Sequence, residues 1–195
     1  MRRTKDSPSV ADGNIAIAPV DESLYLRVQG FGADASLVKG ASLSNADKTA
    51  GSQVDAWHYQ PQLIYIRNYS LAAGDGIPAL CRKTLTTSAA TLALDSSECL
   101  VEGIENLQIE FGLDNSVPID FVPDYYEKAP TAAELERAVT ARIYLLARSL
   151  APMPGYSNDK SYNLGAITIA ALDDGYYRRV LQTTVMLRNS EAFGF

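Results

Sequence analysis

The chain has 195 residues, of which 47% are hydrophobic and 21% are charged, and its formal net charge is −6. This length and composition suit one folded domain, or a domain with an attached arm, and they exclude a chain that is disordered throughout. The acidic balance argues against a general nucleic-acid-binding protein, and no run of about 18 uncharged apolar residues is present that would cross a bilayer.

The amino-terminal third is expected to combine strands with a long loop. Residues 1–22 are mixed and turn-rich, and we interpret them as a flexible arm that precedes a single globular β-rich head over residues 23–195. Residues 30–53 are rich in Gly, Ala and Ser and predict a loop with at most a short helix. Three stretches have strand composition: residues 24–29, 54–59 and 62–69.

Cys81 and Cys99 are the only cysteines. The residues between them predict two strands with a turn near Ser88, which would bring the two cysteines to the same height in a hairpin. We expect a disulfide between them, which would stabilise the fold by about 3 kcal/mol and imply an oxidising compartment. The alternative is a pair of buried thiols in a cytosolic protein. The spacing matches neither a CxxC redox motif nor a four-ligand zinc site.

The next part of the chain contains one predicted strand and one predicted helix. Apolar and polar residues alternate over 107–112, which is typical of a strand with two different faces. Thr131 and Glu134 have the spacing of a capping box, which predicts a helix over 131–139. Residues 140–149 fit a helical stripe and a strand alternation equally well.

The sequence ends with a predicted hairpin. Asp173-Asp174-Gly175 is a strong turn signal, because glycine tolerates positive φ, and it lies between strand-like residues 163–172 and 176–189. Together these elements predict an α+β fold with a mostly antiparallel sheet of seven to nine strands and one or two short helices.

No arrangement of residues points to an active site. His58 is the only histidine, and the sequence contains neither a GxSxG elbow nor a glycine-rich phosphate loop, so we expect no catalytic residue, no enzymatic activity and no cofactor. Asp114, Asp120 and Asp124 are candidate oxygen ligands for Ca²⁺, although the loop lacks the EF-hand alternation. The other interpretation is a simple polar loop.

Two further functions stay open on the residues alone. The eleven tyrosines, together with the loop over 114–124, leave open a module that binds carbohydrate or another surface ligand, and scattered carboxylates leave open a hydrolase. Charge is also uneven: residues 95–136 contain eleven acidic residues and one basic residue, whereas residues 137–188 contain seven basic and three acidic residues. We interpret these charges as solvated faces and cross-strand pairs; the alternative is complementary contacts in an assembly.

Four blocks of the sequence resemble, in the same order, the PilW-type minor pilins of type IV pili. The first contains the Gly-x-Pro-x-Leu-x-Arg stretch that begins at Gly76. The blocks are residues 68–82, 100–114, 142–149 and 174–189. The resemblance implies a pilin- or pseudopilin-like head in which a short helix over 131–139 is followed by a strand. It also implies a non-enzymatic subunit that helps to prime pilus assembly and to form the pilus tip.

The resemblance further implies partners and a location. The partners are other minor pilins, a tip adhesin and the major pilin of a pilus that serves functions such as adhesion and motility. The head is implied to lie in the periplasm, anchored in the inner membrane by a hydrophobic amino-terminal helix, and to reach the extracellular tip later. Because that helix is not in this sequence, we expect this chain to be the soluble head of a longer precursor. The oxidising periplasm would permit the Cys81–Cys99 disulfide. A minor pseudopilin of a type II secretion system is the alternative within the same general plan.

Overall fold

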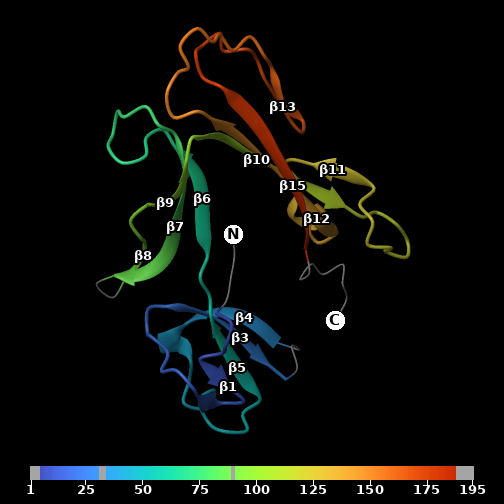
Figure 1. Ribbon diagram of the computed structural model, residues 1–195. Coiled ribbons are helices and arrows are strands. Elements are labelled where there is room, and N and C mark those ends of the chain that lie inside the picture. Colours follow the sequence, from blue (N-terminus) through green and yellow to red (C-terminus); the bar gives the residue numbers. More distant parts are fainter. Residues whose placement is uncertain (1–4, 31–33, 89–90, 188–195) are drawn as a thin grey trace. The chain divides into compact units, whose positions relative to one another are not determined.

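A computed structural model describes residues 5–30, 34–88 and 91–187 (Figure 1). In these residues the fold is almost entirely β: fifteen strands accompany one α-helix of four residues, α1 (Ala132–Leu135), and one short 3-10 turn, η1 (Gly40–Ser42). The predicted α+β class, with seven to nine strands and one or two short helices, is therefore wrong, although the sheets are antiparallel as expected. No helix in the described ranges has the length and apolar character needed to cross a membrane.

The chain divides into two compact units, residues 1–64 with 81–98 and residues 65–80 with 99–195. The first contains an antiparallel sheet in the order β2-β1-β5-β3-β4. Its strands are β1 (Val10–Ala11), β2 (Asn14–Ile15), β3 (Leu24–Gln29), β4 (Asp34–Lys39) and β5 (Val54–His58). The strands predicted near 24–29 and 54–59 are confirmed, and β4 forms where a loop was predicted, paired along its length with β3.

A small core holds this sheet together. It consists of Val10, Tyr25, Leu43 and Ala56, each at most 2% exposed. Val10 therefore packs in the core although it belongs to the segment interpreted as an arm. The ring of Tyr25 stacks on His58 with 5.3 Å between centroids.

A second sheet contains both cysteines. It has the order β6-β7-β8, with β9 also paired to β7, and its strands are β6 (Gln62–Arg67), β7 (Ala79–Ser88), β8 (Thr91–Leu94) and β9 (Glu98–Glu102). Ser88 of β7 lies opposite Thr91 of β8, so the two strands pair antiparallel as predicted, and residues 89–90 of the predicted turn lie outside the described residues. Cys81 of β7 and Cys99 of β9 are disulfide-bonded, and Cys81 is fully buried.

The second unit contains a four-stranded antiparallel sheet in the order β11-β10-β12-β15. Its strands are β10 (Ile104–Leu113), β11 (Tyr125–Glu127), β12 (Ala138–Arg148) and β15 (Arg178–Met186), and a separate hairpin pairs β13 (Tyr162–Leu164) with β14 (Ile167–Ile169). The hairpin predicted around Asp173-Asp174-Gly175 is wrong, because β15 pairs with β12 instead.

The capping box confirms where the helix begins, but not its length. Thr131 accepts a hydrogen bond from the Glu134 backbone, and the Glu134 side chain accepts one from the Thr131 backbone. The helix buries no residue and ends at Leu135, and an isolated helix this short is unstable by itself. The ambiguous residues 140–149 lie mostly in β12, which pairs with β10 on one side and β15 on the other. Pairing along both edges, together with side-chain packing, favours the strand.

Candidate interaction surface

The two faces of the sheet β11-β10-β12-β15 differ in their cover. On the first, which we call the covered face, Tyr144 and Leu146 pack against Leu164 of β13, and all three are at most 6% exposed. Tyr162, Ile169 and Val180 pack around this cluster. The β13–β14 hairpin thus lies over this face.

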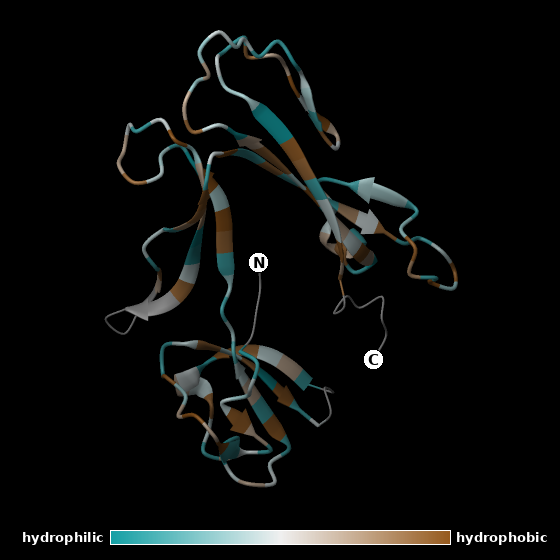
Figure 2. Ribbon diagram, viewed as in Figure 1, coloured by the Kyte–Doolittle hydropathy of each residue, from teal (hydrophilic) through white to brown (hydrophobic). Residues whose placement is uncertain are grey.

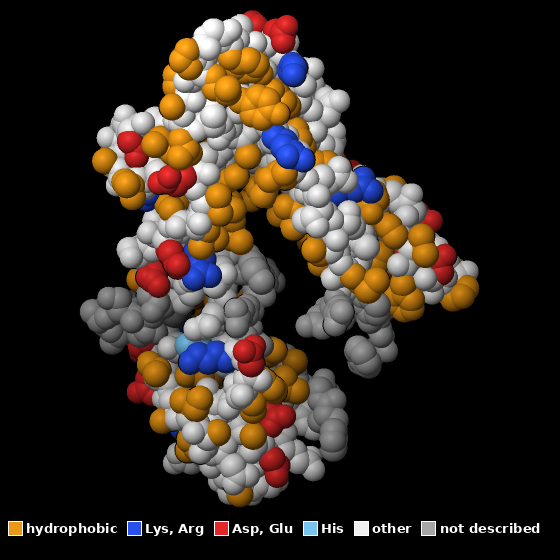
Figure 3. Space-filling model, viewed as in Figure 1, with side chains coloured by type: hydrophobic (Ala, Val, Ile, Leu, Met, Phe, Trp, Pro, Cys, Tyr) orange, Lys and Arg blue, Asp and Glu red, His pale blue; other side chains and the backbone are white. Residues whose placement is uncertain are grey.

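The opposite face, which we call the open face, is apolar but only partly buried in the described part of the chain. Its cross-strand rows follow from the register, for example Leu107–Leu145–Leu181. Ile109 is 38% exposed, Leu181 45% and Val185 40%. The open face consists of Leu107, Ile109, Phe111, Ile143, Leu145, Ala147, Leu181 and Val185. Figure 3 shows hydrophobic side chains at the surface around these strands, with Lys and Arg side chains among them.

On the more polar side of β10, the buried carboxylate of Glu110 contacts the β13–β14 hairpin. Glu110 is only 6% exposed and accepts hydrogen bonds from the backbone N–H of Ala166 (2.6 Å) and the hydroxyl of Tyr144 (3.3 Å). Gly165 lies directly against this carboxylate at φ +65°, and a Cβ atom there would overlap it. The hairpin turn therefore fits onto Glu110 because residue 165 has no side chain.

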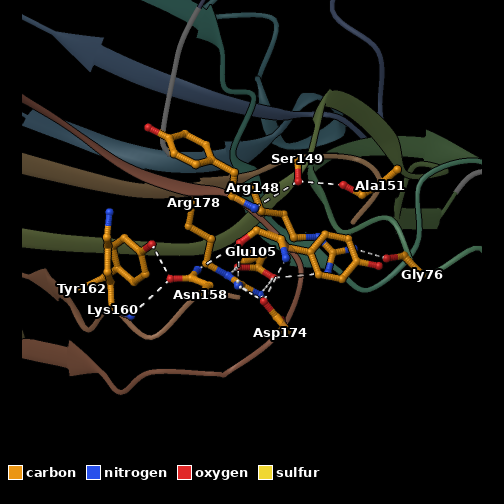
Figure 4. Close-up of polar contacts among 12 residues, drawn as sticks. Gly76, Glu105, Arg148, Ser149, Ala151, Asn158, Lys160, Tyr162, Asp174 and Arg178 are labelled. Carbon is orange, nitrogen blue, oxygen red and sulfur yellow. Dashed lines mark hydrogen bonds and ion pairs between the residues drawn. The ribbon is translucent and has the colours of Figure 1, made fainter. Parts of the chain in front are cut away.

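A cluster of charged side chains fastens the connection between β14 and β15 to one end of the sheet (Figure 4). Arg178 is 4% exposed. Its guanidinium donates to both oxygens of Glu105 (2.6 and 3.0 Å) and to both oxygens of Asp174 (2.5 and 2.7 Å). Such paired hydrogen bonds between arginine and carboxylate are strong and fix the relative orientation of the groups.

The strand register explains why the cluster needs Glu105. Arg148 of β12 lies directly opposite Arg178 of β15, and like charges at opposed positions repel. The register shifts between Ile104 and Asn106. Glu105 is the extra residue at this bulge, and it also accepts a hydrogen bond from Arg148 Nη1 at 3.4 Å. One carboxylate therefore lies between two arginines, as bulges often redirect a side chain.

The remaining contacts of the cluster extend it to the loop that precedes β15. The Tyr176 ring lies 4.0 Å below the guanidinium of Arg148 and 5.8 Å from that of Arg178. Arg148 also donates to the carbonyl of Gly76. Asn158 is fully buried and donates from its side chain to the Tyr176 carbonyl at 3.0 Å. The loop is thus held by hydrogen bonds as well as by charge.

The hydrogen bonds between Arg178 and Asp174 stabilise the ionised forms of these two side chains. Hydrogen bonds from Arg178 lower the pKa of Asp174 below its ordinary value, and those to Asp174 raise the pKa of Arg178 further. Groups held this firmly in one charge state are unsuited to moving protons near neutral pH. The cluster therefore has a structural role, which is to hold the connection between β14 and β15 against the sheet.

The three aspartates proposed as Ca²⁺ ligands serve as acceptors for the backbone of their own loop. Asp114, which is fully buried, accepts from the N–H groups of Ser116, Asp120 and Phe121 at 2.7 to 3.0 Å. Burial by itself raises the pKa of Asp114, but these hydrogen bonds lower it below its ordinary value.

The other two aspartates accept hydrogen bonds from different residues. Asp124 accepts from the N–H of Asn115, and Asp120 accepts from that of Val122. Among the residues that the structure describes, no three acidic, histidine or cysteine side chains form a group that could hold a metal ion.

His58 is half-buried against Tyr25. Burial lowers the pKa of His58, and the positive charge of Lys5 lowers it further. The side-chain contacts that the structure gives it are those of a packed aromatic residue.

No local pattern in the sequence predicts the cluster. Glu105 lies 43 residues from Arg148 and 73 residues from Arg178 along the chain. No motif spacing could therefore join these hydrogen-bonded residues. The uneven charge was the available signal: the acidic residue comes from the acidic stretch and both arginines from the basic one. At this cluster the two stretches meet within the chain.

Comparison with known proteins gives one match. The family model of the type IV pilus-assembly protein W (PilW) matches residues 65–189, which include β10, β12 and β15. No curated protein and no solved structure matches the chain. Because the family model covers more than half of the sequence, the chain belongs to the PilW family of type IV pilus-assembly proteins.

Proposed function

We propose that this chain is a minor pilin that helps to prime pilus assembly and to form the tip complex. Membership of the PilW family gives a role in type IV pilus assembly and contacts with other assembly proteins. The finer role rests on the form of the second unit, which presents an apolar sheet face and a tightly fastened charged cluster. The proposal needs no catalytic step and no cofactor.

The open face is the observation that carries this proposal. A sheet whose one face is apolar is stable when a second layer covers that face. Exposed apolar patches on proteins of this kind mark interaction sites. We propose that an apolar helix of the pilus covers the open face, and that other minor pilins, a tip adhesin and the major pilin are the partners. The head would be anchored at the inner membrane and face the periplasm before it reaches the pilus tip.

A complementation experiment tests this proposal. In a host strain that lacks the gene, the full-length protein carrying Ile109→Lys or Leu181→Lys should restore few or no surface pili, because each lysine introduces a charge into the contact. Val101→Lys is the matched control, since Val101 is 51% exposed on β9, away from the open face, and it should restore normal numbers. Pili are counted by electron microscopy and protein levels by immunoblot. Normal piliation with both open-face variants at wild-type protein levels would refute the proposal.

A further inference from the structure

The outer edge of β15 is an unprotected strand edge. β15 is the last strand of its sheet, and no described strand pairs with its outer side. From Val180 to Met186 it contains no charged residue, no proline and no glycine. Proteins usually protect such edges with charges, prolines, bulges or a covering segment. Figure 2 shows hydrophilic residues at the start of β15 and a mixture of hydrophobic and hydrophilic residues beyond them.

The hydrogen bonds at the two ends of β15 show which backbone groups point outward. The N–H of Ser149 donates to the carbonyl of Tyr177, and the N–H of Leu187 donates to the carbonyl of Val139. In an antiparallel pair, alternate residues bond to the same neighbour. The odd-numbered residues of β15 therefore bond to β12, and the even-numbered ones direct their N–H and C=O groups away from the sheet. The outward residues with exposed side chains are Gln182, Thr184 and Met186.

The sequence of this edge is self-complementary. Two copies related by a two-fold axis must pair antiparallel. With the axis at Thr183, Leu181 lies opposite Val185 of the second copy, Val180 opposite Met186, Gln182 opposite Thr184, and Thr183 opposite itself. Apolar residues then meet apolar ones, and polar residues meet polar ones. Pairs of this kind stabilise antiparallel sheets.

Moving the axis by one residue removes this match. With the axis at Gln182, Arg179 lies opposite Val185, Leu181 opposite Thr183 and Val180 opposite Thr184, so every pair except the central one joins an apolar side chain to a polar or charged one. Both registers keep the even-numbered residues as the hydrogen-bonded pairs, which the outward direction of their backbone groups requires, so the match of side chains favours the Thr183 register. Over residues 179–187 it brings no two like charges together, because Arg179 then lies opposite Leu187.

We propose that β15 is a homodimer interface, at which the outer edges of two copies pair antiparallel about Thr183 and join their sheets. The partner is a second copy of this chain. The interface uses the backbone edge of β15 and, of the open-face residues, pairs only Leu181 and Val185, so this inference goes beyond the proposed function and can fail without it.

Proline substitution tests the hydrogen bonds at the edge. Gln182→Pro removes an outward N–H, and a proline is tolerated on an edge strand where its nitrogen points away from the sheet. By sedimentation of the complete 195-residue chain, we expect a reversible dimer whose Kd increases at least about tenfold with Gln182→Pro, since about 1.4 kcal/mol corresponds to that factor. Gln182→Ala is the matched control, because it keeps the N–H, and its Kd should stay within about twofold of wild type.

Cysteine substitution tests the register. At the two-fold axis, the Thr183 Cα atoms of the two copies form a non-hydrogen-bonded pair about 4.5 Å apart, which is within the range of a disulfide. Thr183→Cys should therefore give a covalent dimer on mild oxidation. Thr184→Cys is the control, because its two copies are displaced along the strands beyond disulfide reach, and it should cross-link far more slowly.

The outcomes separate the possibilities. A wild-type chain that is monomeric at its highest soluble concentration overturns the inference, and so does equal cross-linking of the two cysteine variants. A dimer that Gln182→Pro leaves unchanged uses another surface and also overturns it. Circular dichroism of each variant shows whether it is folded, and Thr183→Cys adds a readout that does not depend on proline.

Discussion

Within the sheet β11-β10-β12-β15, the two sides of strand β10 are arranged opposite to the usual way. On β10, the face that carries Glu110 is covered by the β13–β14 hairpin, whereas the face that carries Leu107, Ile109 and Phe111 is only partly buried in the described residues. An amphipathic strand normally turns its apolar side to the core. The covered face therefore combines an apolar cluster around Tyr144, Leu146 and Leu164 with the hydrogen-bonded carboxylate of Glu110, whereas the apolar side of β10 stays partly exposed among the described residues.

Removing Arg178 should have the largest effect on this arrangement. Arg178→Met leaves the carboxylates of Glu105 and Asp174 without their main partner, and we expect a loss of about 3 to 5 kcal/mol in the free energy of unfolding. Arg179→Met is the control: Arg179 is exposed and makes no ion pair with any described residue, so its change should stay within about 0.5 kcal/mol. Urea denaturation followed by far-ultraviolet circular dichroism measures both. Equal losses would mean that the cluster does not hold the loop.

A matched pair of leucines compares the two faces directly. Leu146 is 2% exposed on the covered face, and Leu181 is 45% exposed on the open face. We expect Leu146→Ala to lower the free energy of unfolding by about 3 kcal/mol and Leu181→Ala by less than about 1 kcal/mol. Urea denaturation measures both changes, and hydrogen exchange of the β12 amides is the second measurement. Tryptophan fluorescence would not report on this sheet, because the only tryptophan, Trp57, lies in the other unit. Similar losses for the two variants would show that the open face is covered within the isolated chain.

Two glycines test how closely the turn of the β13–β14 hairpin packs against Glu110. Gly165 (φ +65°) lies against Glu110, whereas Gly155 (φ +74°) has no atom within 4 Å of an added Cβ. Both alanine variants incur about 1 kcal/mol of backbone strain. Gly165→Ala should cost about 1 to 3 kcal/mol more, because its Cβ overlaps the buried carboxylate. Thermal denaturation compares them, and indistinguishable melting temperatures would contradict the close contact with Glu110.

The smallest expected effect is the response to acid. The pKa of Asp174 is lower in the folded protein than its ordinary value of 3.8, because of hydrogen bonds from Arg178. Its contribution to stability is therefore complete above about pH 4 and is lost as the pH falls through the lower, folded-state pKa. Its side chain is 32% exposed, so solvent screens the interaction and the effect is modest.

Asp174→Asn tests this acid response. The difference in melting temperature between the wild type and Asp174→Asn should be constant at neutral pH and shrink below about pH 4. A difference in melting temperature that does not depend on pH would show that the ionised Arg178–Asp174 pair does not stabilise the folded protein.

Local signals in the sequence predicted local structure well. Strand composition located β3, β5 and β6, the two strands on either side of the turn predicted near Ser88 pair with each other, and the capping box indicated the start of α1. Pairing between distant segments was not predictable in the same way. Asp173-Asp174-Gly175 is a good turn by itself, but β12 offers β15 a nine-residue register from Thr140 to Arg148, which outweighs any local hairpin.

Family membership, the positions of several strands and the lack of a recognisable catalytic motif could all be read from the amino-acid sequence, because these depend on neighbouring residues and on short blocks in a fixed order. Only the tertiary structure decided which face of β10 is covered and that Glu105, Arg148 and Arg178 meet. Both depend on the register and bulges of strands far apart in the chain, and a shift of one residue moves every side chain to the other face.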